Sequence, residues 1–380
     1  MSRMPTCIRN TTPSWRFNWT ASEQLWRAPA LVAVSIAAYE PEWFLLDLLQ
    51  NAVTFSEPST RLVLHYNCNP EPIRPSSTPH RGDQPSWAVL EQASDPFRGL
   101  PKRVELNPEC VTVRKFCGSI LHAHVLNIQY IERRTAPSAL PKYIVLQASN
   151  SRWIRPGWEA HVARHESSII ATTRVNPSPP VPKEGKGSLL TQLTMQLSNG
   201  TSCYSYFDHE GAFLPFDRAI SFSRALPGAI AAASGRGSEL GLSTLDAARG
   251  AFEEYALPTY VASRLVVESA ASDCVARASK RVVCMGLSPG ELRVGCATTL
   301  TRFDGLIGTV RNPKERGIIQ LPLPSIVQAL RKQAAQGVYS LKLLDRSFNS
   351  PILLSVAKLG RLERLRKDPG ARRRMTRRGR

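Results

Sequence analysis

Two adjacent carboxylates, Glu253 and Glu254, stand in the stretch FEEYALPTY (252–260) of a chain whose formal net charge is +19. A carboxylate can take the proton of a hydroxyl group as that hydroxyl attacks an electrophile, so either residue is a candidate general base. The like charge of Glu253 disfavours ionisation of Glu254 and is expected to raise the pKa of Glu254 towards neutrality. The alternative is a solvated pair at a helix end, between an Ala-rich run and a Pro-Thr turn.

Other familiar catalytic patterns are absent from the sequence. There is no GxGxxG after a predicted strand, no GxxxxGK[ST] and no HExxH. Dinucleotide, P-loop and zinc-protease chemistry therefore lack a sequence motif. His122 and His124 lie two positions apart on a predicted helix and point to different faces, so we interpret them as core or interhelix residues rather than ligands of one metal.

The hydrophobic pattern predicts strands and helices in alternation at the start of the chain. Residues 31–39 form a short apolar run typical of a buried strand, residues 41–55 repeat apolar side chains at helical period, and residues 61–67 form a second apolar run. A strand, a helix and a strand in this order indicate a βαβ unit and a parallel sheet.

The same alternation continues further along the chain. A strand is predicted within 103–108, a helix over 118–134 with Ser119 as its N-cap, and another strand over 142–150. Residues 209–226 are predicted to begin with a tight Gly turn and to continue as a helix. We therefore expect an α/β fold with a mixed, mostly parallel sheet flanked by helices and joined by long loops.

Composition and pattern divide the chain into four parts. A hydrophobic content of 42% suits a globular core, whereas 29 Pro and 23 Gly predict much loop. We expect an irregular segment over 1–28, one α/β domain over 29–270, a weakly patterned part over 271–358 that completes the domain, and a basic disordered tail over 359–380.

Polar residues follow the predicted strands. In open α/β sheets the ligand binds at the carboxyl ends of the strands, and here those ends carry Tyr39, Asn67, Ser149 and Asn150. These four residues are therefore candidate ligand-binding residues.

The order of these segments resembles the core-2/I-branching β-1,6-N-acetylglucosaminyltransferases, in particular divergent plant and algal relatives. The resemblance runs from about residue 31 to residue 260. It rests on five segments, which are VSIAAYEPEWFLLDLLQNAV, GSILHAHVLNIQYI, KYIVLQASNSRWIRPGWE, HEGAFLPF and EEYALPT.

The resemblance implies a GT-A-like nucleotide-sugar fold and inverting transfer of a sugar, expected to be N-acetylglucosamine, from a UDP-sugar to a glycan or glycoprotein. Aligning Thr259 with the threonine of the family's acidic motif places Glu254 on the general base, with Glu210 as second choice. The acceptor side would be lined by His209, Gly211 and Trp153. For Trp153 and Trp158 the alternative to stacking on a sugar is packing in the core.

The family does not depend on a metal, and the matching turn Ala148-Ser149-Asn150-Ser151 has no acidic residue. No metal or other cofactor is therefore expected. In the family a basic pair follows the base and stabilises the diphosphate. The candidates for that role are Arg311, Lys314 and Arg316 in TVRNPKERG, and the alternative is a solvated turn.

The resemblance also implies a Golgi enzyme of the secretory pathway, associated with the membrane through an N-terminal anchor missing from this sequence. The chain has eight Cys at scattered positions, which could form four disulfides or remain eight free thiols. Nucleic acid is not an expected partner of such an enzyme.

Two other hypotheses stay open. One is a protein that binds nucleic acid or another polyanion through the Arg-rich stretch 361–380, and the other is an inactive transferase homologue that lacks the diphosphate-binding pair.

Overall fold

A computed structural model describes residues 26–39, 42–66, 104–109, 111–114, 117–149, 151–164, 188–200, 212–235, 241–268, 286–287, 327–328, 330–331, 334–335, 339–342 and 351–367. Within these ranges a five-stranded sheet has the order β3-β2-β1-β4-β6. Its strands are β1 (Val32–Ala38), β2 (Arg61–Tyr66), β3 (Val104–Leu106), β4 (Tyr143–Ala148) and β6 (Ala212–Pro215). The first four pair in parallel, and β6 runs antiparallel to β4. The expected α/β class with a mixed, mostly parallel sheet is confirmed.

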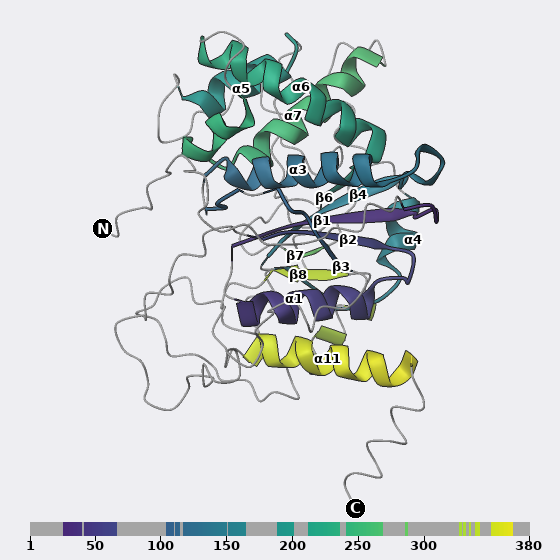
Figure 1. The fold of residues 1–380 in the computed structure, drawn as a ribbon. Coiled ribbons are helices and arrows are strands. Elements are labelled where there is room, and N and C mark those ends of the chain that lie inside the picture. The colour runs from purple at the N-terminus through teal and green to yellow at the C-terminus, as the bar shows by residue number, and fades with distance from the viewer. Residues whose placement is uncertain are drawn as a thin grey trace, which may run out of the picture.

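Helices cover both faces of this sheet (Figure 1). The helix α1 (Glu42–Phe55) lies on one face and α3 (Ser119–Arg134) on the other. Three helices, α5 (Leu189–Leu197), α6 (Phe216–Ser234) and α7 (Phe252–Glu268), form a further layer beyond α3, and α11 (Pro351–Lys367) lies beyond α1. Both faces of β1 are therefore buried, which explains why its sequence is an unbroken run of apolar and small residues.

The two faces of β1 contribute to separate cores. Val32, Val34 and Ile36 pack with α1 and α11. Ala33 belongs to a core cluster that continues through α3 to α5, α6 and α7, and Ala37 packs with the beginning of α3. Successive side chains of a strand point to opposite faces, so a single strand supplies both layers.

Smaller elements complete the described fold. A second sheet has the order β5-β8-β7. Its strands are β5 (Ser151–Trp153), β8 (Ser340–Lys342) and β7 (Gly286–Leu287), and the remaining elements are the helix α4 (Trp158–Ala163) and the 3₁₀ helices η1 (Pro137–Ala139) and η2 (Leu242–Ala247). Strand β8 pairs antiparallel with β5, so residues 340–342 lie beside the strand that follows β4.

Three local predictions differ from the structure. Strand β6 precedes α6 where only a turn and a helix were expected, and α6 continues through Pro227 to Ser234. Pro258 and Thr259 lie inside α7 rather than in a turn. Ser119 is the first residue of α3 instead of its N-cap, and its hydroxyl accepts a hydrogen bond from the backbone N–H of Arg114 at 2.9 Å.

The boundary predicted at residue 359 falls inside α11, which ends at Lys367. Leu359 is buried against α1, so residues 359–367 belong to the folded domain, whereas 368–380 lie outside the described residues. Among the helices of the described ranges, none is long and apolar enough to span a bilayer.

Glu159 connects α4 to the turn between α1 and β2. Its Oε1 atom accepts hydrogen bonds from the backbone N–H of Glu57 at 2.7 Å and from the hydroxyl of Thr60 at 2.8 Å. The residue is only 2% exposed, and this burial raises the pKa of its carboxyl group above the ordinary value. The native state therefore retains a proton on this group at pH values where the unfolded chain has lost it.

This difference predicts a pH dependence of stability. Between the ordinary pKa of glutamate, about 4.3, and the higher pKa in the fold, the native state binds more protons, so the free energy of unfolding falls as pH rises. Urea unfolding at several pH values is expected to show a smaller decrease for Glu159→Gln than for the wild type, and the exposed control Asp217→Asn should behave like the wild type. Equal slopes for the wild type and Glu159→Gln would contradict this account.

Candidate functional site

The carboxyl ends of the parallel strands define one edge of the sheet. Ala37 of β1 is in register with Ala148 of β4, and Ala38 with Tyr66 of β2. Because α3 leads into the parallel strand β4, it begins at this same edge. The edge is therefore where the strand ends, the first turn of α3 and their flanking loops meet.

Two of the sequence-predicted binding residues lie at this edge. Tyr39 follows β1, is half-buried and packs against Val113, Ile120 and Ala123 near the start of α3. Ser149 follows β4 and is buried. Eight other predicted residues lie outside the described ranges, namely Asn67, Asn150, His209, Glu210, Gly211, Arg311, Lys314 and Arg316.

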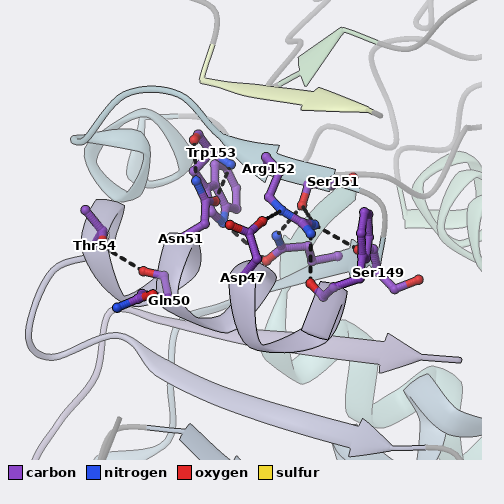
Figure 2. Close-up of polar contacts among 10 residues, drawn as sticks. Asp47, Gln50, Asn51, Thr54, Ser149, Ser151, Arg152 and Trp153 are labelled. Carbon is purple, nitrogen blue, oxygen red and sulfur yellow. Dashed lines mark hydrogen bonds and ion pairs between the residues drawn. The ribbon is translucent and has the colours of Figure 1, made fainter. Parts of the chain in front are cut away.

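A buried guanidinium group holds the turn after β4 against α1 (Figure 2). Arg152 is fully buried and donates to the Asp47 carboxylate at 2.8 Å and to the Phe44 carbonyl at 2.9 Å. It also donates to the carbonyls of Ser149 at 2.9 Å and Ser151 at 3.0 Å. These contacts use every nitrogen of the side chain, so Arg152 shapes this turn and is not itself placed to bind a ligand.

Trp153 is part of the core in this structure. It is 1% exposed, and its ring stacks on that of Trp158 with 4.4 Å between centroids. Its backbone N–H donates to Asn51 at 2.7 Å, its carbonyl accepts from the same side chain at 2.9 Å, and its indole N–H donates to Gln147 at 3.2 Å. Of the two roles considered for Trp153 and Trp158, core packing is the one that both residues have here.

Glu253 and Glu254 lie in the first turn of α7, beside the start of α3. The backbone N–H of Gly118, just before α3, donates to the carbonyl of Ala248 at 3.0 Å. A β-carbon on Gly118 would lie 2.7 Å from the carbonyl oxygen of Leu245 and 3.1 Å from the Phe252 ring, so this close approach requires glycine. The first turn of α7 is therefore packed against the first turn of α3.

The burial of the acidic pair differs from that of a solvated helix end. Glu253 is only 4% exposed, and Glu254 is half-buried. Carboxylates in the first turn of a helix interact favourably with the positive end of the helix dipole. The solvated-pair alternative therefore does not describe Glu253, whereas Glu254 keeps access to solvent at the edge of the domain.

A histidine–aspartate pair lies at the same junction. Nδ1 of His122 is 2.8 Å from Oδ1 of Asp246, and the two residues are 8% and 2% exposed. His124 points elsewhere, with its Nδ1 2.8 Å from the hydroxyl of Ser35 in β1. The prediction that the two histidines are core or interhelix residues on different faces is confirmed, but nothing local in the sequence indicates Asp246, which lies 124 residues from His122.

A third histidine, His65 at the end of β2, lies close enough to interact electrostatically with His122. It is fully buried, and its Nε2 atom is 3.2 Å from both the N–H and the carbonyl oxygen of Val111. Burial lowers the pKa of His65 to about 4, so this imidazole is neutral at neutral pH. In the described part of the chain, no group of three or more His, Cys, Asp or Glu could hold a metal ion.

Cys117, directly before Gly118, is disulfide-bonded. It also forms an isolated antiparallel bridge with Arg249, which precedes α7. The disulfide therefore belongs to the junction that carries the acidic pair and the histidine–aspartate pair.

Comparisons of the sequence with protein-family models and with curated proteins find no match for this chain.

The contacts of Arg152 predict a large effect of its removal. Arg152→Met is expected to lower the free energy of unfolding by about 3–5 kcal/mol, because three buried carbonyls and a carboxylate lose their donor. Denaturant unfolding would measure this loss. The matched control is Arg133→Met, which removes an exposed guanidinium paired with Glu109 and should cost about 1 kcal/mol or less. A loss below about 1 kcal/mol for Arg152→Met would contradict the structural role.

Proposed function

We propose that this chain is an inverting glycosyltransferase that moves a sugar from a UDP-sugar to a hydroxyl group of a glycan or glycoprotein, without a metal. The proposal joins the sequence resemblance to the position of Glu254. Glu254 is half-buried in the first turn of α7, and the first residue of that turn, Phe252, packs beside Gly118 at the start of α3. Ligands of open α/β sheets bind at the carboxyl edge of the sheet, and the acceptor hydroxyl needs a nearby group to take its proton.

The remaining parts of the active site are assigned by the resemblance. The donor side would be marked by Tyr39, which packs near the start of α3, and by Ser149, whose carbonyl accepts a hydrogen bond from Arg152. Within the proposed reaction Glu254 accepts a hydrogen bond from the attacking hydroxyl and is the first candidate for its proton. The finer GT-A-like assignment of the fold is part of the same proposal.

The disulfide at Cys117 supports a place in the secretory pathway. Disulfides persist in oxidising compartments and are rare in the cytosol. A Golgi location fits this chemistry and the acceptor class that we propose.

The proposal predicts a separation between binding and turnover. Calorimetry with EDTA present is expected to show saturable binding of UDP and UDP-N-acetylglucosamine to the wild type and to Glu254→Gln. Turnover of the variant should fall by about 10²-fold or more, because the group beside the attacking hydroxyl can no longer take a proton.

The matched control is Glu57→Gln, an exposed acid in the turn between α1 and β2 at the opposite edge of the sheet. It should retain wild-type turnover. The absence of UDP and UDP-sugar binding by the folded wild type would overturn the proposed function.

A second candidate function is binding of a polyanion such as nucleic acid. The observation that favours it is the row of exposed basic side chains on α11. Its outer face exposes Lys358, Arg361 and Arg366, although Arg366 forms an ion pair with Glu363. The sequence beyond Lys367 adds six arginines. Such a surface attracts phosphate groups, with an affinity that falls steeply with salt.

Truncation after Lys367 separates the two functions, since α11 itself is needed to cover α1. For the transferase, UDP affinity is expected to be the same with and without residues 368–380. A salt-dependent affinity for a DNA oligonucleotide that collapses on truncation, with no UDP binding by either chain, would favour the second candidate.

A further inference from the structure

The turn after α5 carries a triplet that the proposed reaction does not use. Residues 199–201 read Asn-Gly-Thr, the Asn-X-Ser/Thr pattern that accepts N-linked glycans in secreted proteins. The same pattern begins at Asn10 and Asn18, which lie outside the described residues, as does Thr201. Such triplets also arise by chance, so the structure around Asn199 decides whether this one can carry a glycan.

Asn199 is an exposed residue in a tight turn. Helix α5 ends at Leu197, and Ser198 is its C-cap. The backbone N–H of Asn199 donates to the carbonyl of Gln196 at 3.2 Å. With a φ of 51°, Asn199 is in the left-handed region, and Gly200 follows it there with a φ of 72°. Asn and Gly adopt this conformation most readily at helix ends, so the turn is formed without any contact of the asparagine side chain.

The surroundings of this turn leave room for a large group. Asn199 is exposed, and its side-chain amide forms no hydrogen bond with the residues that the structure describes. A β-carbon on Gly200 would meet no described atom within 4 Å. Met195, one turn earlier on α5, is 42% exposed, and Gln196 is exposed as well. An oligosaccharide on Nδ2 of Asn199 would therefore extend into solvent without displacing a described side chain.

The position of Asn199 in the fold keeps such a group away from the first turn of α7. The beginning of α5 lies beside the start of α7, since a β-carbon on Gly250 would be 2.9 Å from the Leu190 side chain. At the other end of α5, the hydroxyl of Ser263 in α7 donates to the carbonyl of Leu197 at 3.0 Å. A rise of about 1.5 Å per residue puts Ser263 about 16 Å along α7 from its first residue. A glycan beyond Leu197 would thus leave the proposed site open.

The disulfide at Cys117 indicates the compartment that this modification needs. Cys117 is disulfide-bonded, and disulfides form and persist in oxidising compartments such as the lumen of the endoplasmic reticulum. Proteins that pass through that lumen are the ones whose Asn-X-Ser/Thr triplets are glycosylated. Because Cys117 precedes α3 and Asn199 follows α5, the two observations are independent of each other.

We propose that Asn199 is an N-glycosylation site. Its Nδ2 forms a bond to the anomeric carbon of an oligosaccharide carried on a lipid diphosphate, while the bond from that carbon to the phosphate oxygen breaks. The lipid diphosphate leaves with the electron pair, and Nδ2 gives up one proton to the membrane-bound oligosaccharide transferase that catalyses the step. The chain is here the acceptor of a sugar rather than the catalyst. The proposal therefore goes beyond the proposed function and shares with it only the place in the secretory pathway.

The test is mass spectrometry of the peptide that contains Asn199. The full chain is expressed behind a cleavable signal peptide in a eukaryotic secretory host, and it is also isolated from the cells that naturally express it. Treatment with peptide N-glycosidase in heavy-oxygen water is expected to convert Asn199 to labelled Asp in both samples. An untreated sample controls for spontaneous deamidation of the Asn-Gly pair.

Matched variants separate the glycan from the turn. Asn199→Gly removes the acceptor nitrogen and keeps the left-handed turn, so the chain should be secreted folded and without this glycan. Thr201→Ala destroys the pattern and should abolish the modification, whereas Thr201→Ser preserves the pattern and should retain it. If Asn199→Gly is not secreted, the two variants of Thr201 still decide the matter.

The outcomes distinguish this inference from the proposed function. A secreted, folded wild type with an unmodified Asn199 would overturn the inference, and so would an unmodified Asn199 in the naturally expressed protein. Labelling of Asn199 that persists in Thr201→Ala would overturn it as well. A glycan on Asn199 in a chain that binds no UDP would support the inference and overturn the proposed function alone.

Discussion

The position of α3 on the sheet depends on one buried side chain, Asn127. It is fully buried, and its Nδ2 donates to the hydroxyl of Ser35 at 3.0 Å and to the carbonyl of Ile36 at 3.2 Å. Its Oδ1 accepts from Nδ2 of Asn107 at 3.1 Å, just beyond β3. Buried polar groups that lose their partners cost more than the same partners contribute when satisfied, so this network penalises any shift of α3 along β1. The first turn of α3 is therefore held at the carboxyl edge of the sheet, with His122 on it.

On the opposite face of the sheet, a second buried hydrogen-bond network fixes the position of α1. Arg152 joins the turn after β4 to the first turns of α1 through Asp47 and the carbonyl of Phe44, and its guanidinium lies 4.2 Å from the Phe44 ring centroid. One polar network thus positions α3 and another positions α1 at the same edge. A site between two rigid elements keeps its geometry without help from the loops, which is what proton transfer over hydrogen-bond distances requires.

The elements that the sequence predicts well are those whose signals are local. The apolar run of β1, the helical period of α1 and the periodic face of α3 are each readable from one window of the chain. Pro227 and Pro258 were expected to end a helix or to form a turn, because a proline removes one backbone hydrogen bond. Both lie inside helices, where the packing of buried neighbours such as Leu226 and Leu257 stabilises the helix around the proline. Strand β6 has only four residues and forms by pairing with β4, which no local pattern reveals.

The candidate site was predictable only in part, and for the same reason. Glu254, Tyr39 and Ser149 could be proposed as site residues from the sequence alone, because each follows or begins a predicted element. Asp246 could not, because it is brought to His122 by the packing of η2 on α3. This junction has a physical consequence for the proposed chemistry. The positive ends of the α3 and α7 dipoles meet there and are balanced by Asp246, Glu253 and Glu254, so the junction suits a proton acceptor better than an anion. Since Arg152 is also neutralised by its own contacts, the charge that holds a diphosphate must come from other basic residues, of which this chain has a large excess.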